Sequence, residues 1–296
     1  MKYNEYAEMA QEAIRIRDYQ FAQQIIDEAR TKYESDKKEH IQMMKDYEDS
    51  DRSSFGIAYG FLLSSESFDK IIEVEKRLKL GKLEEVLLNT PEVAAEKGII
   101  QNEFHQYDVY DHTIAVVKAL KEKTNDPNMI AAAYLHDIGK PITAKPREYE
   151  GVLQKDENGN IRHTFPDHEF VGEEMVRKMN PNLFIEYNLD QDKVARIVGI
   201  HYEPMKGIHA MRKTRTYTDF EKAYHQLERT LDQSGLTMEE VMNIFLADSI
   251  GKGNAPVDQP ELLLVRDVLL MKRNLSLREV YKVQKNTIRR GYAEKE

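Results

Sequence analysis

The sequence of 296 residues contains no cysteine. This absence excludes disulfides, zinc–cysteine sites, iron–sulfur clusters and thiol nucleophiles. It is typical of a reducing compartment, where disulfides rarely persist. A metal site in this chain would therefore have to use histidine nitrogens and oxygen ligands.

Long hydrophobic runs and an excess of positive charge are also missing. No apolar run approaches the ~20 residues needed to span a bilayer, and residues 1–19 are charged throughout, unlike a signal peptide. The formal net charge is −9, whereas a module that binds duplex DNA normally has a basic surface. We expect a cytoplasmic protein with no membrane or duplex DNA partner. A small phosphorylated substrate held by a few local cations remains compatible with this charge.

Helical periodicity runs through nearly the whole chain and predicts an all-α fold. After two helices in residues 4–48 and a polar break at 49–54, short helices are expected over 55–100, where Thr90 can cap the turn that begins at Pro91. Regular helices are predicted over 111–124, 127–139, 166–180, 192–203, 237–253, 260–274 and 276–292. The core-facing positions of the first two helices are Ala7, Ala10, Ala13, Ile14, Phe21, Ile25, Ile26 and Ala29.

Two segments interrupt this pattern. Residues of about 145–165 alternate weakly on either side of "ENGN", which predicts a small β-hairpin inserted between helices. Residues 205–218 carry many cations and predict a basic loop. Gly139 is expected to end the helix before the insert, and Asp167 to cap the helix after it.

In each of five predicted helices, one polar residue continues the apolar, core-facing stripe. His168, for example, is in line with Val171, Met175 and Met179. Burying such a group without a partner is costly, which indicates that the five helices bring their polar residues together. The five residues are His112, His136, His168, His201 and Asp248.

Each of these residues has a simpler explanation when taken alone. A lone buried histidine is more often a hydrogen-bonded core residue than a metal ligand, and Asp248 could cap the turn that follows it. The pair His136-Asp137 is by itself a weak signal. The joint pattern favours a metal site, because a metal ion satisfies histidine nitrogens and carboxylate oxygens together.

The order of these residues resembles the HD superfamily of metal-dependent phosphohydrolases. Its signature of a histidine, a His-Asp pair and a distal aspartate is matched by His112, by His136-Asp137 in "LHDIGKP" and by Asp248 in "FLADSIGKG". His168 in "DHEFVGEEMV" and His201 in "VGIHYEP" match the two extra histidines of one branch. The motifs look most like the HD domains associated with bacterial tRNA nucleotidyltransferases. The resemblance covers roughly residues 104–255, and neither a nucleotidyltransferase domain nor the GYP motif of HD-GYP proteins accompanies it.

The resemblance implies an HD-domain helical bundle over residues 101–256, an N-terminal helical segment of unassigned role over 1–100, and C-terminal helices and a tail over 257–296. It implies one or two divalent ions, drawn from manganese, iron, nickel, cobalt and magnesium. One ion would be held by His112, His136, Asp137 and Asp248. Asp137 would bridge to a second ion held by His168 and His201.

The reaction implied is hydrolysis of a phosphomonoester or phosphodiester by attack of a metal-bound hydroxide. The substrate expected is a nucleotide, a 2′,3′-cyclic nucleotide or an RNA end, and a homo-oligomer is compatible with the sequence. Two other classes of function stay open: a non-catalytic regulatory protein that binds metal or nucleotide, and a helical scaffold with structural histidines. Loss of turnover in an Asp137→Ala variant that stays folded would indicate an enzyme.

Several cations near the ligand motifs are candidates for holding phosphate. Lys140 lies one turn after His136 and is interpreted either as a catalytic, phosphate-facing lysine like those of the family or as a solvated helix-end lysine. The weaker candidates for substrate binding come from the insert and the basic loop, where a solvated surface is the alternative. They are Lys145, Arg147, Arg162, His163, Lys206, Arg212, Lys213 and Arg215. Asp111, Glu169 and Glu173 flank ligand motifs. Asp111 could orient a ligand, and Glu169 and Glu173 could support His168, but carboxylates in the first turn of a helix are more often at the surface, and we expect them there.

Overall fold

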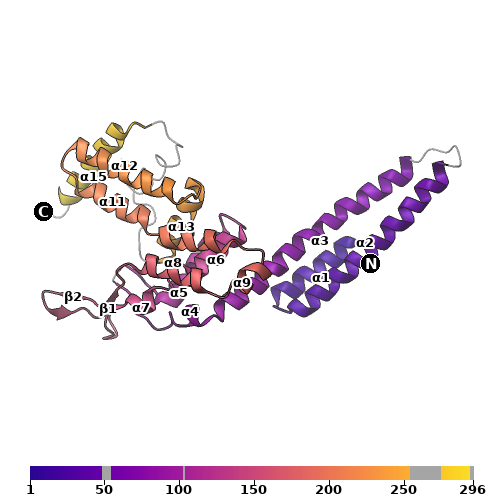
Figure 1. The fold of residues 1–296 in the computed structure, drawn as a ribbon, viewed down its shortest axis with the longest axis horizontal. Coiled ribbons are helices and arrows are strands. Elements are labelled where there is room, and N and C mark those ends of the chain that lie inside the picture. The colour runs from indigo at the N-terminus through magenta and orange to yellow at the C-terminus, as the bar shows by residue number, and fades with distance from the viewer. Residues whose placement is uncertain (49–54, 103, 254–274, 294–296) are drawn as a thin grey trace. The chain divides into compact units, whose positions relative to one another are not determined.

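The computed structural model describes residues 1–48, 55–102, 104–253 and 275–293. Helices dominate these residues, which confirms the all-α prediction (Figure 1). The predicted break at 49–54 and the predicted helix over 260–274 lie outside the described residues. Among the described residues we find no helix with both the length and the apolar character needed to cross a membrane.

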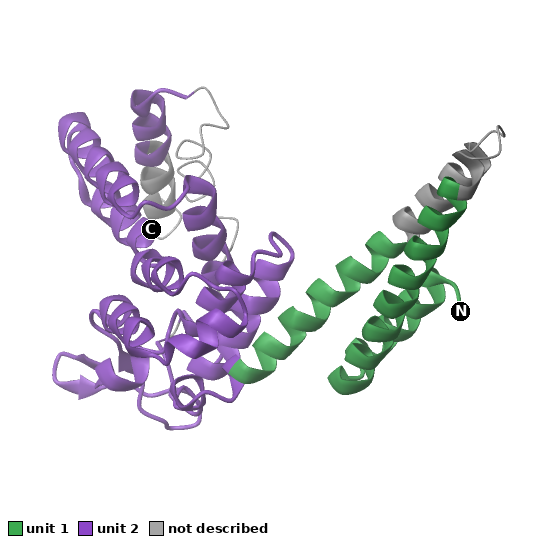
Figure 2. Ribbon diagram, turned by 45° about the vertical axis from the view of Figure 1, so that its right-hand side comes forward, with its two compact units in different colours: residues 1–86 green, residues 87–296 purple. Residues whose placement is uncertain are grey.

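The chain divides into two compact units, Met1–Val86 and Leu87–Glu296 (Figure 2). The predicted division into residues 1–100, 101–256 and 257–296 rests on motifs and stays a prediction. Unit 1 consists of α1 (Tyr3–Arg15), α2 (Tyr19–Glu48) and the greater part of α3 (Phe55–Leu88).

The core of unit 1 is built from small residues on α1 and larger ones on its partners. Ala7, Ala10 and Ala13 follow helical spacing and pack on α2 and α3 with Ile26 and Leu78. Two expectations were wrong here. Phe21 is 43% exposed rather than in the core. Residues 55–88 form one long helix instead of several short ones, because no proline interrupts them.

Unit 2 begins many of its helices with the residues that the sequence offers as caps. The side chains of Thr90, Asp108, Asp190 and Thr237 accept hydrogen bonds from backbone N–H groups of the first helical turn. Asp167 does not act as expected: its backbone is left-handed, with φ of 58°, and its side chain makes no cap. The helices are α4 (Pro91–Ala94), α5 (Val109–Lys121), α6 (Pro127–Leu135), α7 (Lys140–Thr143), α8 (His168–Lys178), α9 (Pro181–Glu186), α10 (Gln191–Ile200), α11 (Glu203–Lys213), α12 (Tyr217–Gln233), α13 (Met238–Gly251) and α15 (Leu277–Ala293).

Helix α6 lies at the centre of unit 2. Every residue from Met129 to Leu135 is buried, which is the pattern of a helix enclosed on all sides. It packs against α5, α10 and α13, while α8 packs on α10. These contacts bring the ends of α5, α6, α8, α10 and α13 to one place.

The predicted basic loop at 205–218 is wrong, because residues 203–213 form α11 and residues from Tyr217 begin α12. Pro204 lies in the first turn of α11, where a missing N–H costs nothing. Gly207 lets α12 approach closely, since a Cβ there would lie 2.5 Å from Leu227 Cδ2. Buried Ile208 and Met211 on the same face complete the contact. The cations of α11 lie at partly buried or exposed positions of this amphipathic helix, and their number made the segment look like a loop.

The insert contains paired strands near the predicted place. β1 (Lys145–Pro146) pairs antiparallel with β4 (His163–Thr164), and β2 (Glu148–Tyr149) with β3 (Val152–Leu153). A further bridge joins Lys155 to Ile161, around the turn containing "ENGN". The expected hairpin is thus a set of short pairings, with a β2–β3 turn at Glu150 and Gly151, both of positive φ.

Glu240 links two of the helices that carry candidate ligands. It completes the capping box of α13 with Thr237, and its Oε1 lies 2.6 Å from the Nζ of Lys193 on α10. Burial opposes ionisation, but Lys193 and Thr237 outweigh it, and the pKa of Glu240 is lowered. A carboxyl whose pKa is lowered by folding stabilises the protein above its unfolded pKa, and this contribution is lost as pH falls through the folded pKa.

We expect Glu240→Gln to lower the free energy of unfolding by about 0.5–1 kcal/mol at neutral pH, since solvent screens the partly exposed pair. Glutamine retains the cap, so the difference should shrink as pH falls below about 4, the unfolded pKa of a glutamate, and vanish below the lowered folded pKa. Urea unfolding of both proteins across pH 3–7 measures this. Glu239→Gln, at an exposed position of the same turn, is the control. An unchanged difference at acid pH would contradict the ion-pair explanation.

Candidate metal centre

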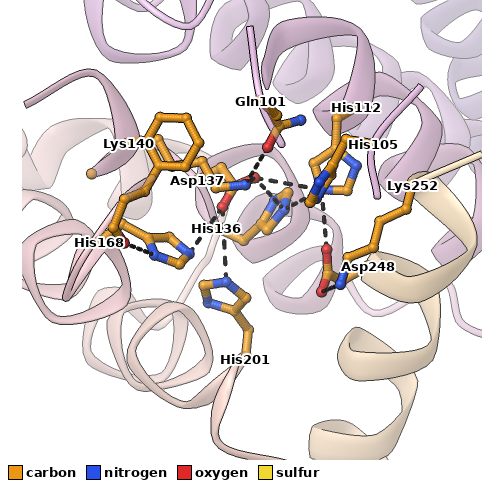
Figure 3. A network of polar contacts seen from close by, with 12 residues as sticks. Gln101, His105, His112, His136, Asp137, Lys140, His168, His201, Asp248 and Lys252 are labelled. Carbon is orange, nitrogen blue, oxygen red and sulfur yellow. Dashed lines mark hydrogen bonds and ion pairs between the residues drawn. The ribbon is translucent and has the colours of Figure 1, made fainter. Parts of the chain in front are cut away.

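The six predicted ligands meet in one buried cluster in unit 2 (Figure 3). His112 comes from α5, Asp248 from α13, and His168 is the first residue of α8. His136 and His201 are the C-cap residues of α6 and α10, so their side chains project beyond helix ends. His112, His136 and Asp137 are at most 1% exposed.

Three of the histidine rings are each held in one orientation by the backbone carbonyl of the residue three positions earlier. The Nδ1 atoms of His136, His168 and His201 lie 2.8, 2.9 and 2.6 Å from the carbonyl oxygens of Ala133, Phe165 and Val198. A carbonyl oxygen only accepts hydrogen bonds, so each Nδ1 is the donor, and in the neutral ring each Nε2 carries the lone pair that can bind a metal. These Nε2 atoms face Asp137.

Asp137 lies between two sets of rings. Its Oδ2 is 3.1 Å from His136 Nε2 and 3.4 Å from His112 Nε2, while its Oδ1 is 3.4 Å from His168 Nε2 and 3.8 Å from His201 Nε2. Oδ1 is buried and has no hydrogen bond within the described residues. Asp248 Oδ1 lies 3.0 Å from His112 Nε2, on the side of the first set.

Two lysines accompany the two carboxylates. Lys140 is 5% exposed. Its Nζ donates to Asp137 Oδ2 at 2.5 Å and to Gln101 Oε1 at 2.7 Å, so it is not the solvated helix-end lysine of the alternative interpretation. Lys252 lies near Asp248, with 3.5 Å between Nζ and Oδ2.

The cluster keeps its carboxylates charged. Burial opposes ionisation of both, but His136 and Lys140 hold the pKa of Asp137 well below its usual range, and Lys252 and His112 do so for Asp248. Burial lowers the pKa of His112, and burial with the charges of His136 and His168 lowers that of His201 to about 3. Burial also opposes a charge on His136, but the carboxylate of Asp137 outweighs it and raises the pKa of His136. Neutral rings and ionised carboxylates are the forms in which these groups bind metal ions.

The residues fit a divalent metal on the basis of their donor atoms. Ligand atoms of His112, His136 and Asp137 lie within 4.8 Å of one another, and so do those of Asp137, His168 and His201. Both groups share Asp137, whose Oδ1 is buried without a hydrogen bond. The mixed nitrogen and oxygen set suits first-row transition metals and does not select one.

Glu169 was expected at the surface, and this was wrong: it is 1% exposed. Its Oε2 lies 3.2 Å from His168 Nδ1, and its Oε1 forms an ion pair with Lys206 of α11. Lys206 also lies 2.7 Å from Glu203 and packs over the ring of Phe170. The buried face of α8 is therefore His168, Glu169, Gly172 and Val176, instead of the predicted stripe through Val171, Met175 and Met179, which are only partly buried.

We expect Glu169→Gln to weaken metal binding about 10- to 100-fold, because the Glu169 carboxylate lies 3.2 Å from Nδ1 of His168 and its negative charge raises the basicity of that ligating ring. Titration calorimetry with Mn²⁺ measures the affinity. Glu174→Gln is the matched control, since Glu174 lies on the same helix in an exposed pair with Lys178. Equal affinities for the two variants would show that Glu169 does not act on His168.

The remaining predicted substrate-binding cations are spread over two elements. Lys145 lies exposed on β1, while Arg147 and Arg162 are half-buried on the insert. His163 joins the insert to the segment before α5 through its Nδ1, 3.1 Å from Ile100 O. Arg212 and Lys213 end α11 and Arg215 follows it. Their binding of substrate stays a prediction, and Lys206 is engaged with Glu169 and Glu203.

Three residues of the cluster were not predicted: Gln101, His105 and Lys252. The ring of His105 stands edge-on to that of His112, with centroids 5.2 Å apart. Burial and the charge of Lys140 lower the pKa of His105 to about 2. Their spacing in the sequence could have indicated two of them: His105 lies seven residues before His112, and Lys252 lies four residues after Asp248.

Comparison with known proteins assigns the site-bearing segment to a class. Residues 109–249 match the sequence model of the HD domain family. This match confirms the resemblance to HD domains inferred from the motifs. HD domains are mostly metal-dependent phosphohydrolases and bind divalent metals, and the His/Asp groups described above could hold such an ion.

A similar curated protein is the A-adding tRNA nucleotidyltransferase of Deinococcus radiodurans, which is 28% identical over 116 residues. The match covers 38% of this chain and only 24% of that enzyme. The chain thus spans about a quarter of its relative's length. No solved structure matches the chain significantly.

Proposed function

We propose that this protein is a metal-dependent phosphohydrolase acting on a phosphomonoester or phosphodiester of a nucleotide, a 2′,3′-cyclic nucleotide or an RNA end. The observation that supports it most is Asp137, one buried carboxylate with two histidines on each side and an oxygen without a hydrogen bond. A structural core carboxylate would have its oxygens satisfied by donors. The similarity of part of the chain to a tRNA nucleotidyltransferase supports a nucleotide or RNA substrate.

In this proposal each residue has a stated task. His112, His136, Asp137 and Asp248 would hold one ion, and Asp137, His168 and His201 a second. Bound divalent ions activate water and offset the charge of a phosphoryl group. Lys140 would donate a hydrogen bond from its ammonium to a phosphate oxygen, and Gln101 would hold that ammonium in place.

The test is to purify the protein, measure its bound metals, and assay generic phosphomonoesters and phosphodiesters with added Mn²⁺ or Ni²⁺. We expect bound metal and turnover that a chelator removes. A folded protein with no metal and no metal-stimulated turnover would overturn the proposal.

A further inference from the structure

Lys252 is a nearly buried cation with few hydrogen-bond acceptors near its ammonium. It is 9% exposed at the C-cap of α13, and its backbone oxygen accepts a hydrogen bond from Gln106 N at 2.9 Å. Among the described residues, its ammonium pairs with Asp248 alone, at 3.5 Å. This distance is long for a hydrogen bond. An ammonium has three donors, and Lys140, by comparison, donates to two acceptors at 2.5 and 2.7 Å.

The charge of Lys252 acts on residues of three segments around the cluster. Burial is the largest influence on the pKa values of His105, Tyr202 and His209, but the charge of Lys252 also acts on each of them. These residues come from the segment before α5, the α10–α11 junction and α11. Figure 3 shows Lys252 reaching Asp248 on one side of the cluster, with Lys140 on the other side.

The charges of the cluster point to an anionic ligand. Lys140 and Lys252 are paired with the two carboxylates, Asp137 and Asp248. The positive charge of divalent ions bound there would have no further counter-charge among these four residues. A buried excess of positive charge is costly unless an anion accompanies it.

We propose that Lys252 binds the phosphate of the substrate, opposite Lys140, by donating hydrogen bonds to a non-bridging phosphate oxygen. This inference rests on the proposed function, because the phosphate binds at the same metal centre. The competing explanation is a structural ion pair that only holds Asp248 in place. The two explanations differ in what a Lys252 variant loses: phosphate affinity or metal affinity.

The experiment is calorimetric titration of inorganic phosphate into the Mn²⁺-saturated protein. Lys252→Gln should bind phosphate about tenfold more weakly with unchanged Mn²⁺ stoichiometry, since a charge-assisted hydrogen bond is lost. Lys178→Gln is the matched control, because Lys178 forms the same i,i+4 pair with Glu174 on the exposed surface. Unchanged phosphate affinity in Lys252→Gln, or a loss confined to Mn²⁺ binding, would overturn the proposal.

A second measurement needs no variant and covers the case in which Lys252→Gln does not fold. In the wild-type protein with Mn²⁺, phosphate should slow acetylation of Lys252 by acetic anhydride, read by mass spectrometry, and leave Lys178 unaffected. Labelling of Lys252 that is measurable without phosphate and unchanged with it would overturn the proposal.

A phosphoester assay on the same preparation separates the two possible failures. Turnover in the wild type with unchanged phosphate affinity in Lys252→Gln overturns the role of Lys252 alone. No turnover, with a tenfold loss of phosphate affinity in the variant, supports the anion site and overturns the hydrolase.

Discussion

Replacing Asp137 with asparagine is expected to abolish metal binding on both sides of the cluster and to reduce phosphoesterase turnover by at least about a thousandfold. Asp137 is the residue common to both candidate ligand groups. Asparagine keeps the shape but removes the negative charge that two sets of histidines and Lys140 surround. Metal content by mass spectrometry and turnover with Mn²⁺ measure the two effects.

The matched control for this prediction is Asp111→Asn. Asp111 precedes His112 on α5 but is exposed, so its variant should retain metal and turnover. Circular dichroism must show that both variants are folded. A folded Asp137→Asn protein that hydrolyses phosphoesters at the wild-type rate would exclude a role for this carboxylate in the reaction.

Replacing Gly139 with alanine is expected to destabilise the protein by about 3 kcal/mol. A Cβ at this position would lie 2.1 Å from the backbone oxygen of His168 and 2.8 Å from the backbone nitrogen of Gly172. Backbone atoms cannot rotate away as a side chain can, so either the segment carrying Asp137 or the start of α8 must move. Metal affinity should fall together with the free energy of unfolding, because Asp137 and His168 would separate.

The control for Gly139 is Gly199→Ala on α10. There a Cβ would also meet an atom at 2.1 Å, but this atom is Oε2 of Glu173, the end of a flexible side chain. We expect this variant to lose much less stability. Urea unfolding of both variants decides the matter, and equal stabilities would show that the approach of α8 to Gly139 has no energetic importance.

The residues that the sequence could place are those on strongly periodic helices. His112, His136, His201 and Asp248 follow apolar stripes, and the helices that carry them lie close to their predicted ranges. The structure brings their side chains together as expected. Their binding of metal stays a prediction.

The features that helical periodicity failed to predict depend on contacts with residues distant in the sequence. The burial of Glu169 depends on Lys206, which lies 37 residues later on α11. α11 itself was taken for a loop, because its cations hid a buried face that packs against α12. Gly139 was expected to end a helix, but α6 ends at Leu135 and the glycine provides space for α8. Tertiary contacts determine the structure in each of these cases, and such contacts cannot be inferred from the local composition of the sequence.

Because β1 pairs with β4, the length of the insert between these strands does not determine where the ligands on either side of it lie. The strands hold residues 145 and 164 as neighbours, and the ring of His163 is hydrogen-bonded to the carbonyl oxygen of Ile100. Segments whose ends are fixed close together tolerate insertions at little cost, because loop-closure entropy grows slowly with length. Residues 147–161 could therefore be shortened or extended while Asp137 and His168 keep their distance. The spacing between the two ligands in the sequence is thus free to evolve independently of their spacing in the folded protein.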